Sequence, residues 1–312
     1  MTPARPSTQR GAALLTAMII VTLIVTLAAS MVWQQWRAVE VETAERARTQ
    51  SAWILNGALD WARLILREDA RSGRATMLTE PWATPLAEAR LSTFLAADRT
   101  NAEDAPDAFL SGSIEDAQAR FNLTNLVQGG QLVAAEVTAL DELCQSVGVS
   151  SDVGTRIAQG LLSAEAPTTS GSTTAVPLRP RSIAQLAWLG VDADSIQRLA
   201  PYVVILPVTT VVNVNTAPRE VIAAVVPGLD LASAERLVRA RPFKAPAEIV
   251  KQLPNTPVGG RLDVRSAFFE VRGRLRLENH VLEQRSLIQR RGLDIVVLRR
   301  EQVSMQELAS PR

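Results

Sequence analysis

The chain has 312 residues, of which 47% are hydrophobic, and its formal net charge at pH 7 is +1. This length leaves room for one or two folded domains beside a membrane segment. The balanced charge excludes a strong overall field that would recruit nucleic acid or an acidic partner. The single cysteine, Cys144, and the single histidine, His280, exclude an intramolecular disulfide and a shared Cys/His metal site. No GxSxG, HExxH, P-loop or CxxC motif occurs, and we therefore do not expect an enzyme.

An uncharged apolar segment from Ala12 to Val32 follows a short leader that ends in Arg10-Gly11. At a rise of about 1.5 Å per residue, a helix over this segment spans roughly 30 Å, which is the thickness of a bilayer hydrocarbon core. Arg5 and Arg10 precede the segment and no acid does. The positive-inside rule therefore predicts a cytoplasmic N-terminus, with everything after Trp33 across the membrane.

Three interpretations of this segment compete. A cleaved secretory signal needs a shorter apolar core and a small-residue cleavage site, for which Ala28 to Ser30 is a weak candidate. A plain signal anchor is the second interpretation. The third places cleavage before the apolar segment, between Gly11 and Ala12, where a glycine without a Cβ lets the backbone enter a protease site.

The junction QRGAALLTAM resembles the leader of type IV pilins and of the pseudopilins of type II secretion. The resemblance implies that a prepilin peptidase cuts after Gly11 and methylates the new N-terminus at Ala12. Most pilin-like proteins carry glutamate at the fifth mature position, and this chain has Thr16 there. A carboxylate in lipid is costly unless it is paired, so its loss fits a subunit with no neighbour above it. In this respect the chain resembles the K-type minor pseudopilin family of type II secretion.

The anchor is predicted to continue as one long helix to about Arg71, since no proline interrupts it and apolar residues recur every three or four positions. Its apolar faces are expected to contact partner helices or the chain's own head, and the sequence does not separate these two roles. The positions concerned are Leu14, Ile19, Leu23, Ile54 and Trp61.

Residues 73–107 are predicted to form loops around a short helix. The following segment keeps a period near two, which predicts a strand that ends near Leu123. Its phrase ARFNLTNL resembles the K-type family, in which a strand runs directly into an inserted helical domain. From about Val127 to Leu253 the pattern is helical, with SIAQLAWLG among the predicted helices. Two junctions repeat a helix, a glycine turn, an acidic cap and a second helix, which resembles tandem helix-hairpin-helix or SAM-like modules.

The hairpins raise an alternative function, a membrane-anchored periplasmic helix-hairpin-helix protein that binds DNA. Such proteins hold a phosphate with the free N–H groups of a glycine-rich turn and the next helix. Here Asp230 follows one turn, and Asp192 and Asp194 follow the other. Carboxylates at a helix N-terminus satisfy the helix dipole themselves and repel phosphate, so we do not expect nucleic acid as a partner.

No cofactor is expected, although calcium is left open. The acidic run from Asn101 to Asp107 could bind calcium, but a solvated loop explains it more simply. The resemblance implies an acidic, calcium-coordinating stretch in the helical insert of many K-type relatives. This chain has a Ser/Thr/Gly-rich loop from Ala164 to Thr174 in its place.

The C-terminal part returns to strands. Three runs are predicted at Ala267–Leu277, His280–Gln289 and Leu293–Arg299, with a tight turn at Arg291-Gly292. They indicate an antiparallel meander with one face on the long helix.

Together these patterns predict an α+β fold, in which a long N-terminal helix packs on a small antiparallel sheet and a large all-α domain is inserted. The expected segments are a leader at 1–11, a transmembrane helix at 12–32, the helix and first part of the head at 33–124, a helical insert at 125–257 and a β-meander at 258–312. The resemblance implies a minor pseudopilin at the tip of the type II secretion pseudopilus, which caps it and helps to initiate its assembly. It also implies other minor pseudopilins and prepilin peptidase as partners, in the inner membrane, with the bulk of the chain in the periplasm.

Overall fold

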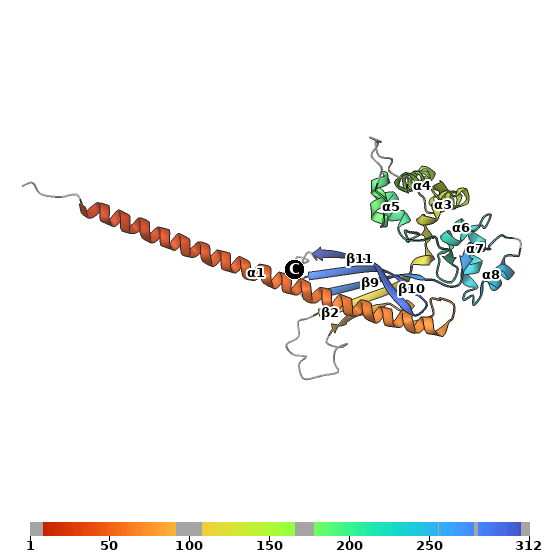
Figure 1. Cartoon of the computed structure of the whole chain (residues 1–312), viewed down its shortest axis with the longest axis horizontal. Coiled ribbons are helices and arrows are strands. Elements are labelled where there is room, and N and C mark those ends of the chain that lie inside the picture. The colour runs from red at the N-terminus through yellow and green to blue at the C-terminus, as the bar shows by residue number, and fades with distance from the viewer. Residues whose placement is uncertain (1–8, 92–107, 166–177, 255, 278–279, 307–312) are drawn as a thin grey trace, which may run out of the picture. The chain divides into compact units, whose positions relative to one another are not determined.

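The structure is a computed structural model that describes residues 9–91, 108–165, 178–254, 256–277 and 280–306 (Figure 1). The chain forms two units, residues 1–54 and residues 55–312, and each is described by itself.

The first unit consists of the N-terminal part of helix α1, Gln9–Ser72. Neither proline nor glycine occurs between Ala12 and Asn56, so nothing in the sequence interrupts the helical hydrogen bonds. The hydroxyls of Thr22 and Thr26 donate to carbonyl oxygens one turn earlier, each at 3.0 Å. These bonds satisfy polar side chains inside an apolar segment. The predicted long helix is confirmed.

The second unit is built on a five-stranded antiparallel sheet with the order β1-β2-β9-β10-β11. The strands are β1 Leu86–Arg90, β2 Ala108–Asp116, β9 Phe268–Leu277, β10 His280–Arg291 and β11 Asp294–Gln306. Figure 1 shows them along the C-terminal part of α1. The meander is confirmed, and its last two strands are longer than predicted. The turn between them contains Gly292 at φ 62°, a conformation that glycine adopts without strain.

One face of the sheet packs against α1. The buried side chains at this contact are Leu59, Ala62 and Leu66 from α1 and Phe269, Val271, Ile288 and Ile295 from the sheet. Trp82 closes the cluster, with its ring edge-on to Phe269 at 5.3 Å between centroids. Burying such aromatic and aliphatic groups is the main force that holds the helix on the sheet.

Three predictions for the second unit were wrong in part. The short helix after α1 is present as the 3-10 helix η1 Pro81–Ala83, but the edge strand β1 was not predicted. The strand expected to reach Leu123 ends at Asp116, because the Asp116 carboxylate accepts a hydrogen bond from Gln118 N at 2.8 Å and turns the chain into the 3-10 helix η3 Ala117–Ala119. SIAQLAWLG forms a 3-10 helix, η5 Ile183–Leu189, which Gly190 ends at φ 77°.

The remaining helices lie between the strands of the sheet along the chain and gather in one group in Figure 1. They are α3 Ala134–Ser146, α4 Ser151–Glu165, α5 Ala193–Leu199, α6 Arg219–Val225, α7 Leu231–Arg239 and α8 Pro246–Gln252. They share one hydrophobic core, in which Leu140, Leu143 and Ile157 are fully buried. Cys144 belongs to this core, and burial raises the pKa of its thiol to about 11, so it is an unreactive apolar residue there.

Two short parallel strand pairs divide this helical region into two similar modules. In the first, β3 Phe121–Asn122 pairs with β6 Val203–Val204, and in the second, β7 Val212–Asn213 pairs with β8 Leu262–Asp263. The second residue of each opening strand is an asparagine whose side-chain oxygen accepts a hydrogen bond from the backbone N–H two residues later. The repeat is thus visible in backbone pairing and in side-chain chemistry. The smaller elements of the first module are η4 Leu123–Leu126, β4 Val127–Gln128 and β5 Gln131–Leu132.

Candidate functional site

The N-terminal part of α1 is the first functional surface. Within α1, the segment Ala13–Ser72 is long and apolar enough to cross a membrane. Its most apolar stretch has a mean hydropathy of 2.4. Leu14, Ile19 and Leu23 are each more than 60% exposed. An apolar surface of this length has to be covered by lipid or by other protein.

The predicted processing junction and the predicted fifth mature position lie on the same helix. Gly11 and Ala12 have helical backbone within α1. The hydroxyl of Thr16 donates to Ala13 O at 3.2 Å, so this side chain bonds to its own helix. No acidic residue occurs between Ala12 and Val32.

The part of α1 in the second unit has two apolar faces. Leu55, Leu59, Ala62 and Leu66 are buried, whereas Trp61 and Leu64 are 53% and 57% exposed. Positions two apart differ by about 200° around a helix, so Leu59 and Trp61 lie on opposite sides. Of the two roles left open by the sequence, packing on the chain's own sheet is therefore excluded for Trp61. Ile54, in the first unit, is half-buried.

A buried polar centre joins the sheet to the second helical module. Asp116, at the end of β2, accepts hydrogen bonds from Ser266 Oγ at 2.6 Å, Thr216 Oγ1 at 2.6 Å and Asn213 Nδ2 at 2.9 Å. Desolvation raises the pKa of the Asp116 carboxyl, and these donors oppose the rise. Because the donors come from different segments, the carboxylate fixes the module to the sheet. Nothing in the sequence pattern predicted this role.

The segment ARFNLTNL forms hydrogen bonds with the linker that joins the two modules. Asn122 receives a hydrogen bond from Leu206 N at 3.1 Å and donates to Val208 O at 2.8 Å. Asn125 exchanges two hydrogen bonds with the backbone of Thr210, at 2.8 and 3.0 Å. Uncharged amides within an apolar stretch were the only sequence signal for this function, since buried polar groups need partners.

The two helical hairpins have acidic N-caps, as predicted. Asp192 accepts from Ser195 N at 2.9 Å, and Asp230 accepts from Ser233 N at 2.6 Å. Hydrogen bonds from Ser195 and Ser233 lower the pKa of each carboxyl. The carboxylates therefore occupy the helix ends at which a phosphate would have to bind.

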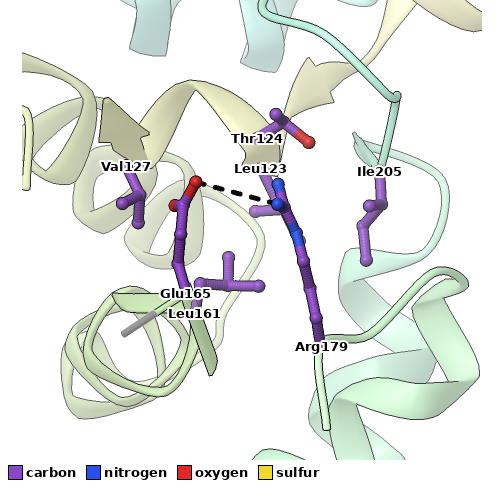
Figure 2. Close-up of a pocket in the computed structure, with 7 residues that line it drawn as sticks. All are labelled: Leu123, Thr124, Val127, Leu161, Glu165, Arg179 and Ile205. Carbon is purple, nitrogen blue, oxygen red and sulfur yellow. Dashed lines mark ion pairs between the residues drawn. The ribbon is translucent and has the colours of Figure 1, made fainter. Parts of the chain in front are cut away.

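Two cavities lie among the described residues. One, in the first module, has a volume of about 10 Å³. Figure 2 shows Glu165 and Arg179 in its lining, where they form an ion pair of 3.8 Å. A larger cleft of about 170 Å³ lies between η5 and the sheet. Its arginines are neutralised, for example Arg120 by Glu270 at 2.7 Å. Burial alone would raise the pKa of Glu270, but Arg120 and Arg272 together outweigh it and lower the pKa.

Among the described residues, no group of three or more His, Cys, Asp or Glu side chains could hold a metal ion. The acidic run from Asn101 to Asp107 lies outside the described residues, as does most of the loop from Ala164 to Thr174. Of His280, only the backbone in β10 is described.

Comparison with known proteins identifies the family. Two family models, both described as "Type II secretion system (T2SS), protein K", match this chain. One matches residues 119–208 and the other residues 212–270, and these ranges contain the two helical modules. A type II secretion system protein K of Pectobacterium carotovorum is 28% identical, over 95% of this chain and 97% of the relative. These matches support a type II secretion system protein K, which is a minor pseudopilin. The DNA-binding alternative is not favoured.

Further relatives and one solved structure agree with this assignment. Protein K of Klebsiella pneumoniae is 28% identical over 94% of this chain and 96% of the relative, and that of Pseudomonas aeruginosa is 26% identical over 75% and 72%. The crystal structure of the GspK-GspI-GspJ complex from enterotoxigenic Escherichia coli contains a chain with the same fold, at a TM-score of 0.62 and 21% identity. The match covers 83% of this protein K chain and 98% of that chain. A single N-terminal apolar helix in a pseudopilin is consistent with an inner-membrane anchor.

Proposed function

We propose that this protein K chain is the tip subunit of the pseudopilus, where it caps the fibre and helps to initiate its assembly. The observation that carries the proposal is the absence of any acidic residue from Ala12 to Val32, with Thr16 bonded to its own helix. A carboxylate at that depth needs a cation from the subunit above it. A subunit at the tip has no such neighbour, and a hydroxyl that is satisfied within its own helix needs none.

We infer that its partners are other minor pseudopilins. In the Escherichia coli crystal structure, GspK forms a complex with GspI and GspJ. In this chain, Trp61 and Leu64 supply an exposed apolar face on α1, opposite the face that packs on the sheet. An exposed tryptophan beside an aliphatic side chain is typical of the centre of a protein interface.

The helical region serves, in this proposal, as a rigid block above the assembled heads. The hydrogen bonds of Asp116 to Ser266 and Thr216, and those of Asn122 to the linker, support rigidity because they join segments far apart in the chain. We further propose that the helical region, predicted at 125–257, is an insert that extends from β3 to β8, is built of two helix-hairpin-helix or SAM-like modules and lies between the two head segments predicted at 33–124 and 258–312. The role is structural and involves no catalysis.

Processing and topology complete the proposal. Prepilin peptidase would cut between Gly11 and Ala12 and methylate Ala12, and the mature helix would pack in the inner membrane through positions such as Leu14, Ile19 and Leu23. Arg5 and Arg10 would keep the leader in the cytoplasm, which places the bulk of the chain in the periplasm.

The test is the intact mass of the full chain after co-expression with a prepilin peptidase, beside the variant Gly11→Val. We expect the wild-type chain to lose residues 1–11 and gain one methyl group, and the variant to stay uncut, because the added side chain blocks the cleavage site. An uncut wild-type chain would contradict the proposed role and leave a plain membrane anchor.

A further inference from the structure

Two carboxyl groups with buried side chains lie in one region where α1 ends on the sheet, because Arg290 bonds both Asp69 and Thr76 and the next residue, Met77, bonds Glu80. The Asp69 side chain, in the last turn of α1, is 8% exposed, and Glu80, just before η1, is 6% exposed. Trp82 Nε1 and Met77 N both donate to Glu80 Oε2, at 2.8 and 3.1 Å. The other oxygen, Glu80 Oε1, is buried and receives a hydrogen bond from none of the donors that the structure describes.

Among the described residues around these two carboxyl groups, one cation forms an ion pair with either of them. Arg290 of β10 forms an ion pair with Asp69 at 2.5 Å, and it also donates to Thr76 Oγ1 and Ser266 O. Asp116 lies further along the same network, because Ser266 Oγ donates to it. One guanidinium therefore faces a buried region with an excess of carboxyl groups, which costs free energy if all of them are ionised.

A proton on Glu80 supplies the missing hydrogen-bond partner of Oε1 and also reduces the excess of negative charge. Two ionised carboxylates offer acceptors alone, whereas a protonated carboxyl has an O–H that can donate to its neighbour. Protonation of Glu80 Oε1 gives this buried atom a partner in the Asp69 carboxylate and lowers the local charge by one. Paired carboxyl groups that hold one proton between them are an established arrangement in proteins.

We propose that Glu80 holds a proton on Oε1 in the folded chain and donates it in a hydrogen bond to the Asp69 carboxylate, and that this proton closes a pH-sensitive latch between the end of α1, the η1 segment and β10. The latch is independent of the proposed tip function. Desolvation raises the pKa of Glu80, the hydrogen bonds from Trp82 and Met77 oppose the rise, and the charge of Asp69 and a hydrogen bond with it add to the rise. A group whose pKa is raised on folding contributes stability at low pH and loses it as the pH rises through the folded-state pKa. The latch is therefore closed in acid and weakens as the pH rises above the ordinary range of a glutamate.

The first experiment measures the thermal unfolding midpoint of the full chain in detergent, with a chelator present so that no divalent cation replaces the proton. It compares the wild type with Glu80→Gln, whose amide donates to Asp69 at every pH. The control is Glu88→Gln, which removes an exposed carboxylate from β1 that pairs with Arg276. We expect the unfolding midpoint of Glu80→Gln, expressed as a difference from that of the wild type at the same pH, to increase by roughly 3 °C from pH 5 to pH 8. Glu88→Gln should follow the wild type.

A second readout does not depend on folding stability. The side-chain carboxyl carbon of Glu80, assigned by its absence from the NMR spectrum of Glu80→Gln, should titrate above the pKa of an ordinary glutamate. Titration of Glu80 at its ordinary pKa, or a midpoint difference that is constant with pH, overturns the proposal.

Discussion

Asp116 has partners in three separate parts of the chain. It accepts hydrogen bonds from Asn213 and Thr216 in the second module and from Ser266 before β9, and it caps the turn at Gln118. These partners lie up to 150 positions away in the sequence. No local pattern marks such a residue, because hydropathy and periodicity describe near neighbours. At the residue scale, the polar contacts that fix the insert were therefore beyond prediction.

Removal of this carboxylate should destabilise the second unit strongly. We expect Asp116→Ala to lower the free energy of unfolding by about 3 kcal/mol or more, because several buried donors lose their acceptor. Urea denaturation of the full chain in detergent measures the effect. The control is Asp194→Ala, since Asp194 is 70% exposed and pairs with Arg198 on the surface. Equal stabilities for the two variants would contradict the structural role of Asp116.

Helix α1 and the late strands were predictable at the scale of elements, because each keeps one period over many residues. The edge strand β1 has only five residues and the 3-10 helix η5 only seven, and such short elements carry little periodic signal. The two faces of α1 also required the structure. Ile65 and Trp61 are both large and apolar, but only the sheet decides which side is covered.

The uncovered face of α1 leads to a prediction about binding. We expect Trp61→Asp to weaken co-purification with other minor pseudopilins by about tenfold or more, because a charge replaces an aromatic side chain at the proposed interface. Its own fold should survive, since Trp61 is 53% exposed. The matched control is Trp188→Asp, which changes an equally exposed tryptophan on η5 of the insert. Equal binding by both variants would rule out this face.

At the scale of the whole molecule, the order of long helix, strand, helical region and meander was predictable because the hydropathy pattern and periodicity of each segment differ from those of the next. The resemblance carried by QRGAALLTAM and ARFNLTNL led to the family that the comparisons support. In the sequence, the duplication of the helical modules was visible only as two similar helical hairpins. Its parallel strand pairs, of two residues each, became apparent from backbone pairing.

The most direct test of the tip proposal is the position of this chain on isolated pseudopili, seen by electron microscopy with a gold-labelled antibody against the helical region. We expect label at one end of each fibre and none along its length, because a subunit without the membrane carboxylate cannot pair with a neighbour above it. Label distributed along the fibres would contradict a capping subunit.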